Sequence, residues 1–298
     1  MKVLVLEGGT SAEREVSLRS AKAVKAALVK AGHEVVAYDT KQGLDSLSFF
    51  TDEVDVTFPV LHGTEGEDGV VQAELEMLGM PFVGADAQVS ALCFDKVAFK
   101  ERIAEFNAPT PKWVAVTRDT VEQQDLLNRP FVLKPAKGGS SVNTHIVRDL
   151  TTHTLDFDQI FSTDGEMLLE ELIVGDEITV AVLGDQALPV VEIIPPEGAE
   201  FDYENKYNGA TQELCPPENV ASDIQVAAQQ LAEQIHTELG VRHLSRTDFM
   251  IKDGELWTLE LNTIPGLTDE SLYPKAARAA NISMKELVDK LVCAAASD

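Results

Sequence analysis

The chain has 298 residues, 44% of them hydrophobic and 25% charged, which is typical of a soluble globular protein long enough for two or three domains. Its 24 basic and 50 acidic residues give a formal net charge of −26, which argues against a nucleic-acid or membrane partner. No apolar run approaches the roughly 18 residues of a membrane span, and three scattered cysteines exclude a disulfide framework or zinc site, so we expect a protein of the reducing cytoplasm.

The first 88 residues alternate between short apolar runs and amphipathic patterns. They predict strands at 3–6, 34–38, 54–61 and 81–83, and helices at 11–31 and 68–78, with Ser11 as a candidate N-cap. This alternation indicates an α/β fold in which a parallel sheet has helices on both faces.

Two loops at the expected carboxyl ends of these strands carry glycines and acids. Gly8-Gly9 does not continue as G-x-G-x-x-G, so we reject a dinucleotide fingerprint. Glu13, in S-A-E-R-E, either only favours the helix N-terminus, which is the commoner role, or projects into a ligand site and binds an ammonium. His62 opens the run H-G-T-E-G-E-D-G and either hydrogen-bonds its own loop or faces that site.

The next region combines a helix at 87–105 with strands at 113–116, 130–133 and 167–173 and a helix at 119–127. The strand at 130–133 runs into K-P-A-K-G-G-S-S-V-N, residues 134–143. Small residues flanked by Lys134 and Lys137 can fold over phosphates, although the Walker pattern is missing. Taken alone, the segment is more typical of a hairpin turn with two solvated lysines.

The last region is predicted to contain strands at 177–183 and 187–194, a helix at 220–239, and two C-terminal helices at 273–280 and 283–295. Residues 195–217 show no regular pattern and include Lys206 and Tyr207. Long loops of this kind in compact domains are usually lids or binding loops.

The stretch 246–262 predicts a β-hairpin around Asp253-Gly254. We expect a three-residue loop, from Lys252 to Gly254, because that register gathers the apolar side chains on one face. That face would hold Phe249, Ile251, Trp257, Leu259 and Leu261. The opposite face would hold Arg246, Asp248, Glu260 and Asn262, with Arg246 across from Glu260 and Asp248 diagonal to it.

Two carboxylates about 5 Å apart on facing strands can hold one hard cation, and magnesium prefers such oxygen ligands together with phosphates. A solvated face with a surface ion pair explains the same residues equally well. The loop that follows, with Pro265, Gly266 and Ser271, can turn backbone N–H groups toward an anion.

Nine segments, taken in order, resemble the D-alanine–D-alanine ligase family of the ATP-grasp superfamily, from Val3 to beyond Ser271. Each segment is a weak signal alone, whereas the ordered and correctly spaced set is strong. They are GGTSAEREVS, HGTEGEDG, DK, KPAKGGSSV, the E-x6-E of EELIVGDE, KY, RTD, ELNTIPG and SL.

The resemblance implies three α/β domains, at 1–88, 89–174 and 175–298 with a lid loop at 196–216, and ATP between the central and C-terminal sheets. It implies phosphate-binding lysines at Lys96 and Lys134, acids near adenine and ribose at Glu170 and Glu177, and adenine recognition by the backbone of Glu171 to Ile173. It implies ligands for two Mg²⁺ (or Mn²⁺) ions at Asp248, Glu260 and Asn262.

The resemblance also implies the substrate groups. Stabilisation of the tetrahedral oxyanion falls to Arg246 and the Gly266 N–H. The first D-alanine would be bound by Glu13, in a network with Ser140 and Tyr207, and by His62. The carboxylate of the second D-alanine falls to Ser271, the Leu272 N–H and Lys206.

The implied activity is the ATP-dependent ligation of two D-alanines through an acyl phosphate, for peptidoglycan precursor synthesis, by a homodimer. D-Lactate is an alternative acceptor, but Tyr207 resembles the D-alanine enzymes and favours an amine acceptor. A nucleotide-binding module without catalysis is a second alternative, against which the complete set of acids and cations speaks.

Three features depart from the family pattern. Lys137 stands where many members have Arg, and Asn143 where many have Gly, although Asn tolerates left-handed φ. Asp269 and Glu270 precede Ser271, and we expect both carboxylates to point away from the acceptor pocket or to pair with Lys275, because they would otherwise repel an incoming carboxylate.

Overall fold

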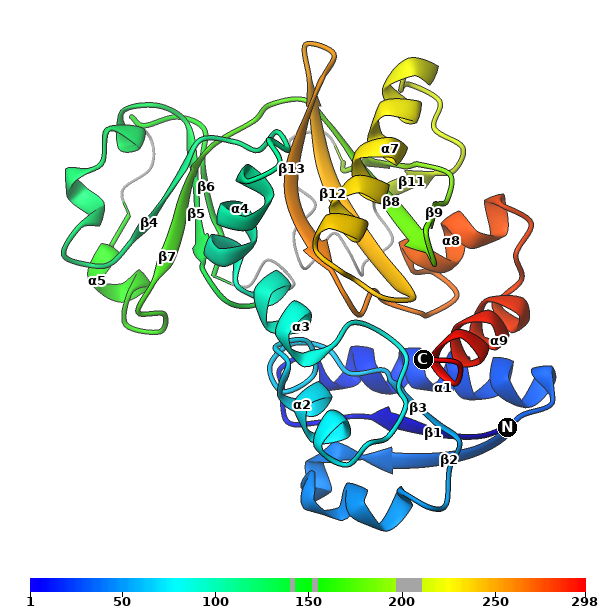
Figure 1. Ribbon diagram of the computed structural model, residues 1–298. Helices are drawn as coiled ribbons and strands as arrows, with labels where there is room; N and C mark the ends of the chain where they lie inside the picture. The colour runs from blue at the N-terminus through cyan, green and yellow to red at the C-terminus, as the bar shows by residue number, and fades with distance from the viewer. Residues whose placement is uncertain (140–142, 152–154, 197–210) are drawn as a thin grey trace.

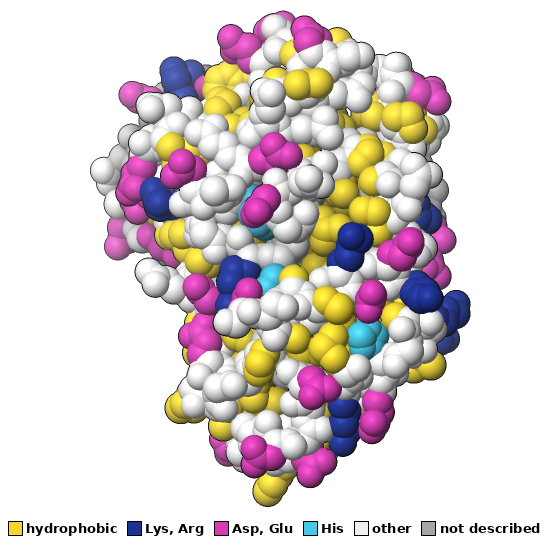
Figure 2. Space-filling view, turned by 45° about the vertical axis from the view of Figure 1, so that its right-hand side comes forward, with side chains coloured by type: hydrophobic (Ala, Val, Ile, Leu, Met, Phe, Trp, Pro, Cys, Tyr) yellow, Lys and Arg dark blue, Asp and Glu magenta, His cyan; other side chains and the backbone are white. Residues whose placement is uncertain are grey.

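Three β-sheets organise the chain in the computed structural model, which describes residues 1–139, 143–151, 155–196 and 211–298 (Figure 1). The sheets follow one another along the sequence, as the α/β prediction requires. On the face shown in Figure 2, acidic side chains are spread over the whole surface, in keeping with the net charge of −26.

The first sheet is parallel, with β1 (Lys2–Glu7) between β2 (Glu34–Asp39) and β3 (Val56–Pro59). Because β1 is covered on both faces, its residues are apolar without alternation. Val3 and Val5 pack toward α1 (Arg14–Ala31), and Leu4 and Leu6 toward α2 (Val70–Met77). Helices on both faces are therefore confirmed, whereas the strand expected at 81–83 is only one bridge, from Phe82 to Thr57. Two short 3₁₀ helices, Thr40–Gln42 and Asp45–Phe50, follow β2.

The end of the chain returns to this first sheet. Helix α9 (Met284–Ala295) lies against α1, near the N-terminus, and follows α8 (Leu272–Ala279) (Figure 1). Leu287 and Leu291 are buried in the same core cluster as Val24 of α1. The last helix therefore completes the core of the first sheet.

The helix expected at 87–105 is divided into α3 (Ala87–Phe94) and α4 (Lys96–Ala104). Asp95 has extended backbone angles, and its carboxylate accepts from the N–H groups of Val97 and Ala98. An N-cap in mid-pattern begins a new helix, which is why the apolar periodicity alone did not reveal the break.

The second sheet is antiparallel and has the order β4 (Trp113–Val116), β7 (Met167–Glu171), β5 (Phe131–Pro135), β6 (His145–Val147), with the short α5 (Phe157–Ile160) beside it. The helix expected at 119–127 is wrong: this segment forms 3₁₀ turns at Val121–Gln123 and Asp125–Asn128. Arg129 precedes Pro130, and a residue before proline disfavours helical angles.

The third sheet runs β11 (Gln212–Leu214), β10 (Val191–Ile194), β8 (Asp176–Leu183), β12 (Leu244–Lys252), β13 (Glu255–Asn262), with β9 (Gln186–Ala187) beside β8. Helix α7 (Ser222–Glu238) covers one face, where Ala228, Ala232 and Ile235 share a core with Val180 and Phe249. On the opposite face, Ala181 of β8 shares a core cluster with Leu272 and Ala276 of α8, and the polar residues of β12 and β13 lie beside it.

The hairpin of β12 and β13 has a two-residue turn, so the expected three-residue loop is wrong. Asp253 and Gly254 take positive φ values of 54° and 79°, and Lys252 pairs with Glu255. Two consecutive left-handed residues give the turn whose twist matches that of the flanking strands.

A β-bulge at Leu259, farther along the hairpin, changes which side chains of β13 face the core. Phe249 pairs with Thr258, whereas Asp248 pairs with Glu260, so one residue of β13 is passed over. Phe249, Ile251 and Leu261 lie in the core as expected; Trp257 and Leu259 do not, and Leu256 packs there instead.

Among the helices in the described ranges, none combines the length and apolar character needed to cross a bilayer.

Candidate active site

The polar face of β12 and β13 brings two carboxylates, a guanidinium and an amide together. Asp248 lies directly opposite Glu260. Arg246 lies opposite Asn262, and its Nε and Nη2 each donate to Asp248 at 2.9 Å. Asp248 also accepts from the Thr179 hydroxyl at 2.5 Å and from Asn262 Nδ2 at 3.2 Å. The sequence predicted the members of this group, but it paired Arg246, not Asp248, with Glu260.

The contact with Asp248 keeps Arg246 positively charged although its side chain is largely buried. Arg246 and Asp248 have side chains that are 15% and 12% exposed, and Glu260 is more open at 29%. Burial lowers the pKa of Arg246, but the charge of Asp248 more than offsets this and the pKa is raised. The guanidinium is therefore a permanent cation that orients Asp248 through a bidentate fork.

The donor set suits a hard divalent cation. Two carboxylates on facing positions and a neighbouring amide oxygen are ligands that Mg²⁺ accepts, with waters and phosphates completing its octahedron. Three or more clustered His, Cys, Asp or Glu side chains, as an all-protein site would need, do not occur among the described residues. The group thus fits an ion that is shared with a phosphate-bearing substrate.

Lysines face this group from the central region. Lys96 Nζ stands 3.8 Å from Glu260 Oε2 and donates to the Gly138 carbonyl at 2.5 Å. Lys137 reaches Asp95 at 3.4 Å. Gly138 has φ 132°, and a cavity of ≈30 Å³ separates it from Glu260. The first part of the Gly-rich segment therefore lies across from the hairpin acids.

Behind Lys96 lies a buried cluster of Lys134, Glu170 and Lys100. Glu170 Oε1 is 2.5 Å from Lys134 Nζ, and Oε2 is 2.9 Å from Lys100 Nζ. Burial raises the pKa of Glu170, but the two lysine charges outweigh it and lower the pKa to about 2. Burial lowers the pKa of Lys134, and the charges of Glu170 and Glu260 overcome it, so the pKa of this ammonium is raised.

The strand end after Glu170 presents the backbone expected at the adenine. The N–H of Glu171 donates to Lys112 O, and the N–H of Leu172 donates to Pro130 O. Ile173 is buried, and Glu177, on β8 and paired across from Met250, contributes its charge near Lys134.

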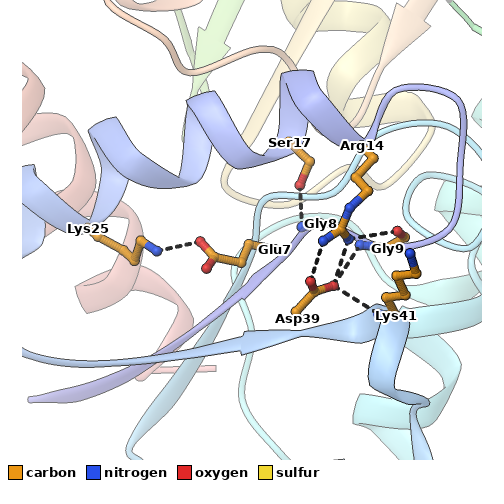
Figure 3. A network of polar contacts seen from close by, with 8 residues as sticks. All are labelled: Glu7, Gly8, Gly9, Arg14, Ser17, Lys25, Asp39 and Lys41. Atoms are coloured by element: carbon orange, nitrogen blue, oxygen red, sulfur yellow. Dashed lines mark hydrogen bonds and ion pairs between the residues drawn. The ribbon is translucent and has the colours of Figure 1, made fainter.

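The loop before α1 is held by a polar network on its first-sheet side. Figure 3 shows the guanidinium of Arg14 facing the carboxylate of Asp39 next to Gly8 and Gly9. Arg14 donates to Asp39 at 2.9 and 2.5 Å and to the Gly9 carbonyl at 3.0 Å, and Asp39 accepts from the Gly9 N–H at 3.3 Å. A Cβ at Gly8, where φ is 77°, would clash with both partners, which explains the glycine.

This network places Glu13 at the N-terminus of α1 with its side chain directed elsewhere. Glu13 is the N-cap residue, but its carboxylate makes no capping hydrogen bond. The Ser11 hydroxyl donates to the His62 carbonyl and accepts from the Glu13 N–H at 3.2 Å. A Cβ on Gly63 or Gly139 would stand 3.0 or 3.2 Å from Glu13 Oε2. Of the two roles considered for Glu13, the structure supports projection into a site.

His62 lies beside Glu13 and is only 6% exposed. Its Nδ1 is 3.9 Å from Glu67 Oε1, and its buried Nε2 has no hydrogen-bond partner among the described residues. Glu67 in turn accepts from the Gly63 N–H at 2.7 Å. Glu67 was missed as a site residue, although it belongs to the acidic Gly-rich run that begins at His62.

A cavity of ≈760 Å³ connects these groups with the loop after β13. Ser271 is the N-cap of α8, so the Leu272 N–H lies at a helix N-terminus, which favours an anion. A Cβ at Gly266 would stand 2.9 Å from Ser271 Oγ. The lining includes Glu13, His62, Arg246, Glu260, Gly266 and Ser271.

The two acids before Ser271 do not pair with Lys275, and the expectation that their carboxylates point away from the acceptor pocket stays a prediction. Lys275 pairs with Glu213 at 2.5 Å, and both Asp269 and Glu270 are exposed and border the cavity. Their exposure lets water screen the repulsion that motivated the expectation.

Three predicted residues, Ser140, Lys206 and Tyr207, lie outside the described residues. Asn143 has φ 53°, as expected for a substitute of glycine in a left-handed position.

Comparison with known proteins gives one consistent result. The family model described as D-ala D-ala ligase C-terminus matches residues 103–293, and the one described as D-ala D-ala ligase N-terminus matches residues 39–85. A D-alanine--D-alanine ligase of Lawsonia intracellularis is 40% identical over 302 residues, covering 100% of this chain and 99% of the relative. One of Citrifermentans bemidjiense is 41% identical over 300 residues, covering 99% and 96%. A D-alanine--D-alanine ligase of Bacillus anthracis crystallised with ATP has a TM-score of 0.86 at 30% identity, covering 99% of this chain and 97% of that one.

Proposed function

Because the chain belongs to the D-alanine–D-alanine ligase family, we infer that the residues around its cavity carry out the ATP-dependent joining of two D-alanines for peptidoglycan synthesis. The observation that carries the assignment of the site is the facing pair Asp248 and Glu260, with the Arg246 fork on one side and Lys96 on the other. This arrangement suits a triphosphate held by cations on both flanks.

ATP would lie between the second and third sheets. Lys96 and Lys134 would contact its phosphates, and Glu177 its ribose. Since the N–H groups of Glu171 and Leu172 are used within the protein, recognition of the adenine edge by an amide would fall to Ile173. Both oxygens of Glu170 are held by lysines, so its contribution beside the adenine would come through Lys134.

The ligation needs an activated carboxylate, because a free carboxylate is a poor electrophile. The γ-phosphoryl group of ATP transfers to the carboxylate of the first D-alanine, giving an acyl phosphate and ADP. The amine of the second D-alanine then attacks the carbonyl carbon, loses a proton, and phosphate leaves. The enzyme supplies positioning, charge stabilisation and exclusion of water, which would otherwise hydrolyse the acyl phosphate.

Two magnesium or manganese ions bound by Asp248, Glu260 and Asn262 would neutralise phosphate charge during the transfer. In the structure Asn262 donates to Asp248 through Nδ2, so its amide oxygen is the atom that would bind a cation. Arg246 and the Gly266 N–H would stabilise the tetrahedral oxyanion.

The two substrates would occupy opposite ends of the cavity. Glu13 would bind the ammonium of the first D-alanine, beside His62 Nε2, which has no hydrogen-bond partner in the part of the chain that the structure describes. Ser271 and the Leu272 N–H would bind the carboxylate of the second. Ser140, Lys206 and Tyr207 are proposed to complete these sites. We also propose a cytoplasmic enzyme, because ligation consumes ATP, and the homodimer that the family implies.

Product analysis tests this function directly. Purified protein with ATP, Mg²⁺ and D-alanine is expected to release ADP, phosphate and D-alanyl-D-alanine in equal amounts. Addition of D-lactate across a range of pH is expected to yield no depsipeptide. Dominant depsipeptide would replace the acceptor assignment, and absence of ADP release would refute the function.

Substitution of Asp39 tests whether the loop network orients Glu13. Asp39→Asn removes the charge that holds Arg14 but keeps one of the two side-chain oxygens as an acceptor. The loop is therefore loosened and not unfolded. We expect KM for the first D-alanine to rise by about three- to tenfold with a smaller change in kcat. Steady-state kinetics over D-alanine concentration provide the measurement, and the exposed Asp45→Asn is the matched control. A fall in kcat alone, with KM unchanged, would contradict this role.

A further inference from the structure

Lys100 is a fully buried lysine that stands behind the proposed phosphate-binding groups. Its side chain is 0% exposed, and it is not among the residues that line the two cavities near the hairpin. Lys100 lies one helical turn after Lys96 on α4, so both ammonium groups leave the helix on the same face. Lys96 reaches the cavity, whereas Lys100 stops short of it.

The contacts of Lys100 join three parts of the chain. Its Nζ is 2.9 Å from Glu170 Oε2 on β7 and donates to Thr110 Oγ1 at 2.6 Å. The Thr110 hydroxyl donates in turn to the Thr258 carbonyl on β13, at 2.8 Å. Glu170 passes the contact on to Lys134, at 2.5 Å. A continuous polar chain thus runs from the metal-site hairpin through Lys100 and Glu170 to Lys134.

The lysines of this cluster outnumber the carboxylates that are paired with them. The ion-pair partners of Lys96, Lys100 and Lys134 in this largely buried region are Glu170 and Glu260. Glu177 adds its charge near Lys134, and Glu67 near Lys96. If Lys100 were absent, the Glu170 carboxylate would be compensated by Lys134 alone, and the pair would present no net charge to a phosphate. With Lys100 present, Glu170 is shared, and a net positive charge remains toward the cavity. At low dielectric this difference is large.

We propose that Lys100 is a positioning residue for ATP: it neutralises Glu170 from behind, so that the ammonium of Lys134 is held in place yet keeps its charge for a phosphate group. The inference rests on the proposed function of Lys134 as a phosphate-binding residue. A side chain that served packing alone would not need a cation at this position, because a whole buried ion pair can often be replaced by apolar side chains without loss of stability.

Nucleotide binding by four variants tests this role. The dissociation constants of ADP and of adenosine are measured by calorimetry for the parent, Lys100→Met, Glu170→Gln, the double variant and Lys134→Met. Lys112→Met, which removes an exposed lysine near the same sheet, is the matched control for net charge. Adenosine lacks phosphate, so its dissociation constant reports on the base and ribose contacts but not on a contact between Lys134 and a phosphate group.

Lys100→Met is expected to weaken ADP by about tenfold, a typical coupling between neighbouring sites, and to leave adenosine unchanged. The sign of the double variant is the sharper result: removing Glu170's charge as well should restore ADP affinity, because Lys134 then loses the carboxylate that contacts it directly. Equal losses for ADP and adenosine, or additive losses in the double variant, would overturn the proposal.

Two comparisons keep the outcome interpretable. If Lys100→Met fails to fold, the effect of Lys100 is read in the Glu170→Gln background, where its removal is expected to leave ADP affinity unchanged. A large loss there would overturn the proposal. If Lys134→Met leaves ADP binding unaltered, the function of Lys134 itself is refuted; if only Lys134→Met weakens ADP, the function stands and the role of Lys100 is refuted.

Discussion

Glu260→Gln is expected to abolish D-alanyl-D-alanine formation while the protein remains folded. Glu260 lies opposite Asp248 on the polar face of the hairpin, is 29% exposed, and has Lys96 at 3.8 Å as its cation partner. The change removes a negative charge from the proposed metal site but conserves side-chain volume and disturbs no core contact. Losing about 4 kcal/mol of transition-state stabilisation, within the range of a metal-ion effect, lowers turnover by about a thousandfold.

Coupled-enzyme measurement of ADP release, with a thermal unfolding scan of the same sample, distinguishes lost chemistry from lost structure. Glu255→Gln is the matched control, since Glu255 begins the same strand and is exposed at the far end of the hairpin. The control should keep parental turnover. Near-parental turnover in Glu260→Gln would contradict the metal assignment.

The hairpin illustrates how far sequence reasoning reaches. The period-two pattern identified both strands and the members of the polar face, but it misplaced Trp257 and Leu259, because a bulge interrupts the alternation. The pairing itself was wrong for two reasons: the turn has two residues instead of three, and a bulge at Leu259, which nothing in the local sequence marks, shifts one strand by a further residue. Asp248 and Glu260 therefore face each other more directly than the sequence argument allowed.

Residues that meet although they are far apart in the sequence were the least predictable. Lys100 was missed: it is 70 positions from Glu170, and its spacing from Lys96 on one helix does not indicate which sheet the helix faces. Thr179 donates to Asp248, but no motif around it in the sequence distinguishes it from other strand residues. By contrast, the loops that carry Glu13 and His62 were recognisable, because glycines and acids gather where parallel strands end.

Arg246→Lys is the second change with a large expected effect, although it conserves the charge. Arg246 uses Nε and Nη2 to hold both oxygens of Asp248, each at 2.9 Å, and this leaves Nη1 for a second partner. A lysine ammonium is a single point of donation and cannot hold a carboxylate in a bidentate fork while also reaching an oxyanion. Because the charge is retained, Asp248 does not become an unpaired buried anion, and the fold is expected to persist.

We expect Arg246→Lys to lower kcat by about a hundred- to a thousandfold, the range for removal of one oxyanion donor, with a smaller change in KM for ATP. Arg278→Lys, on the exposed side of α8, is the matched control and should retain parental kinetics. Initial rates of ADP release at saturating and limiting ATP separate kcat from KM. A loss confined to KM for ATP would assign Arg246 to nucleotide binding, and turnover within about twofold of the parent would show that a positive charge alone is sufficient at this position.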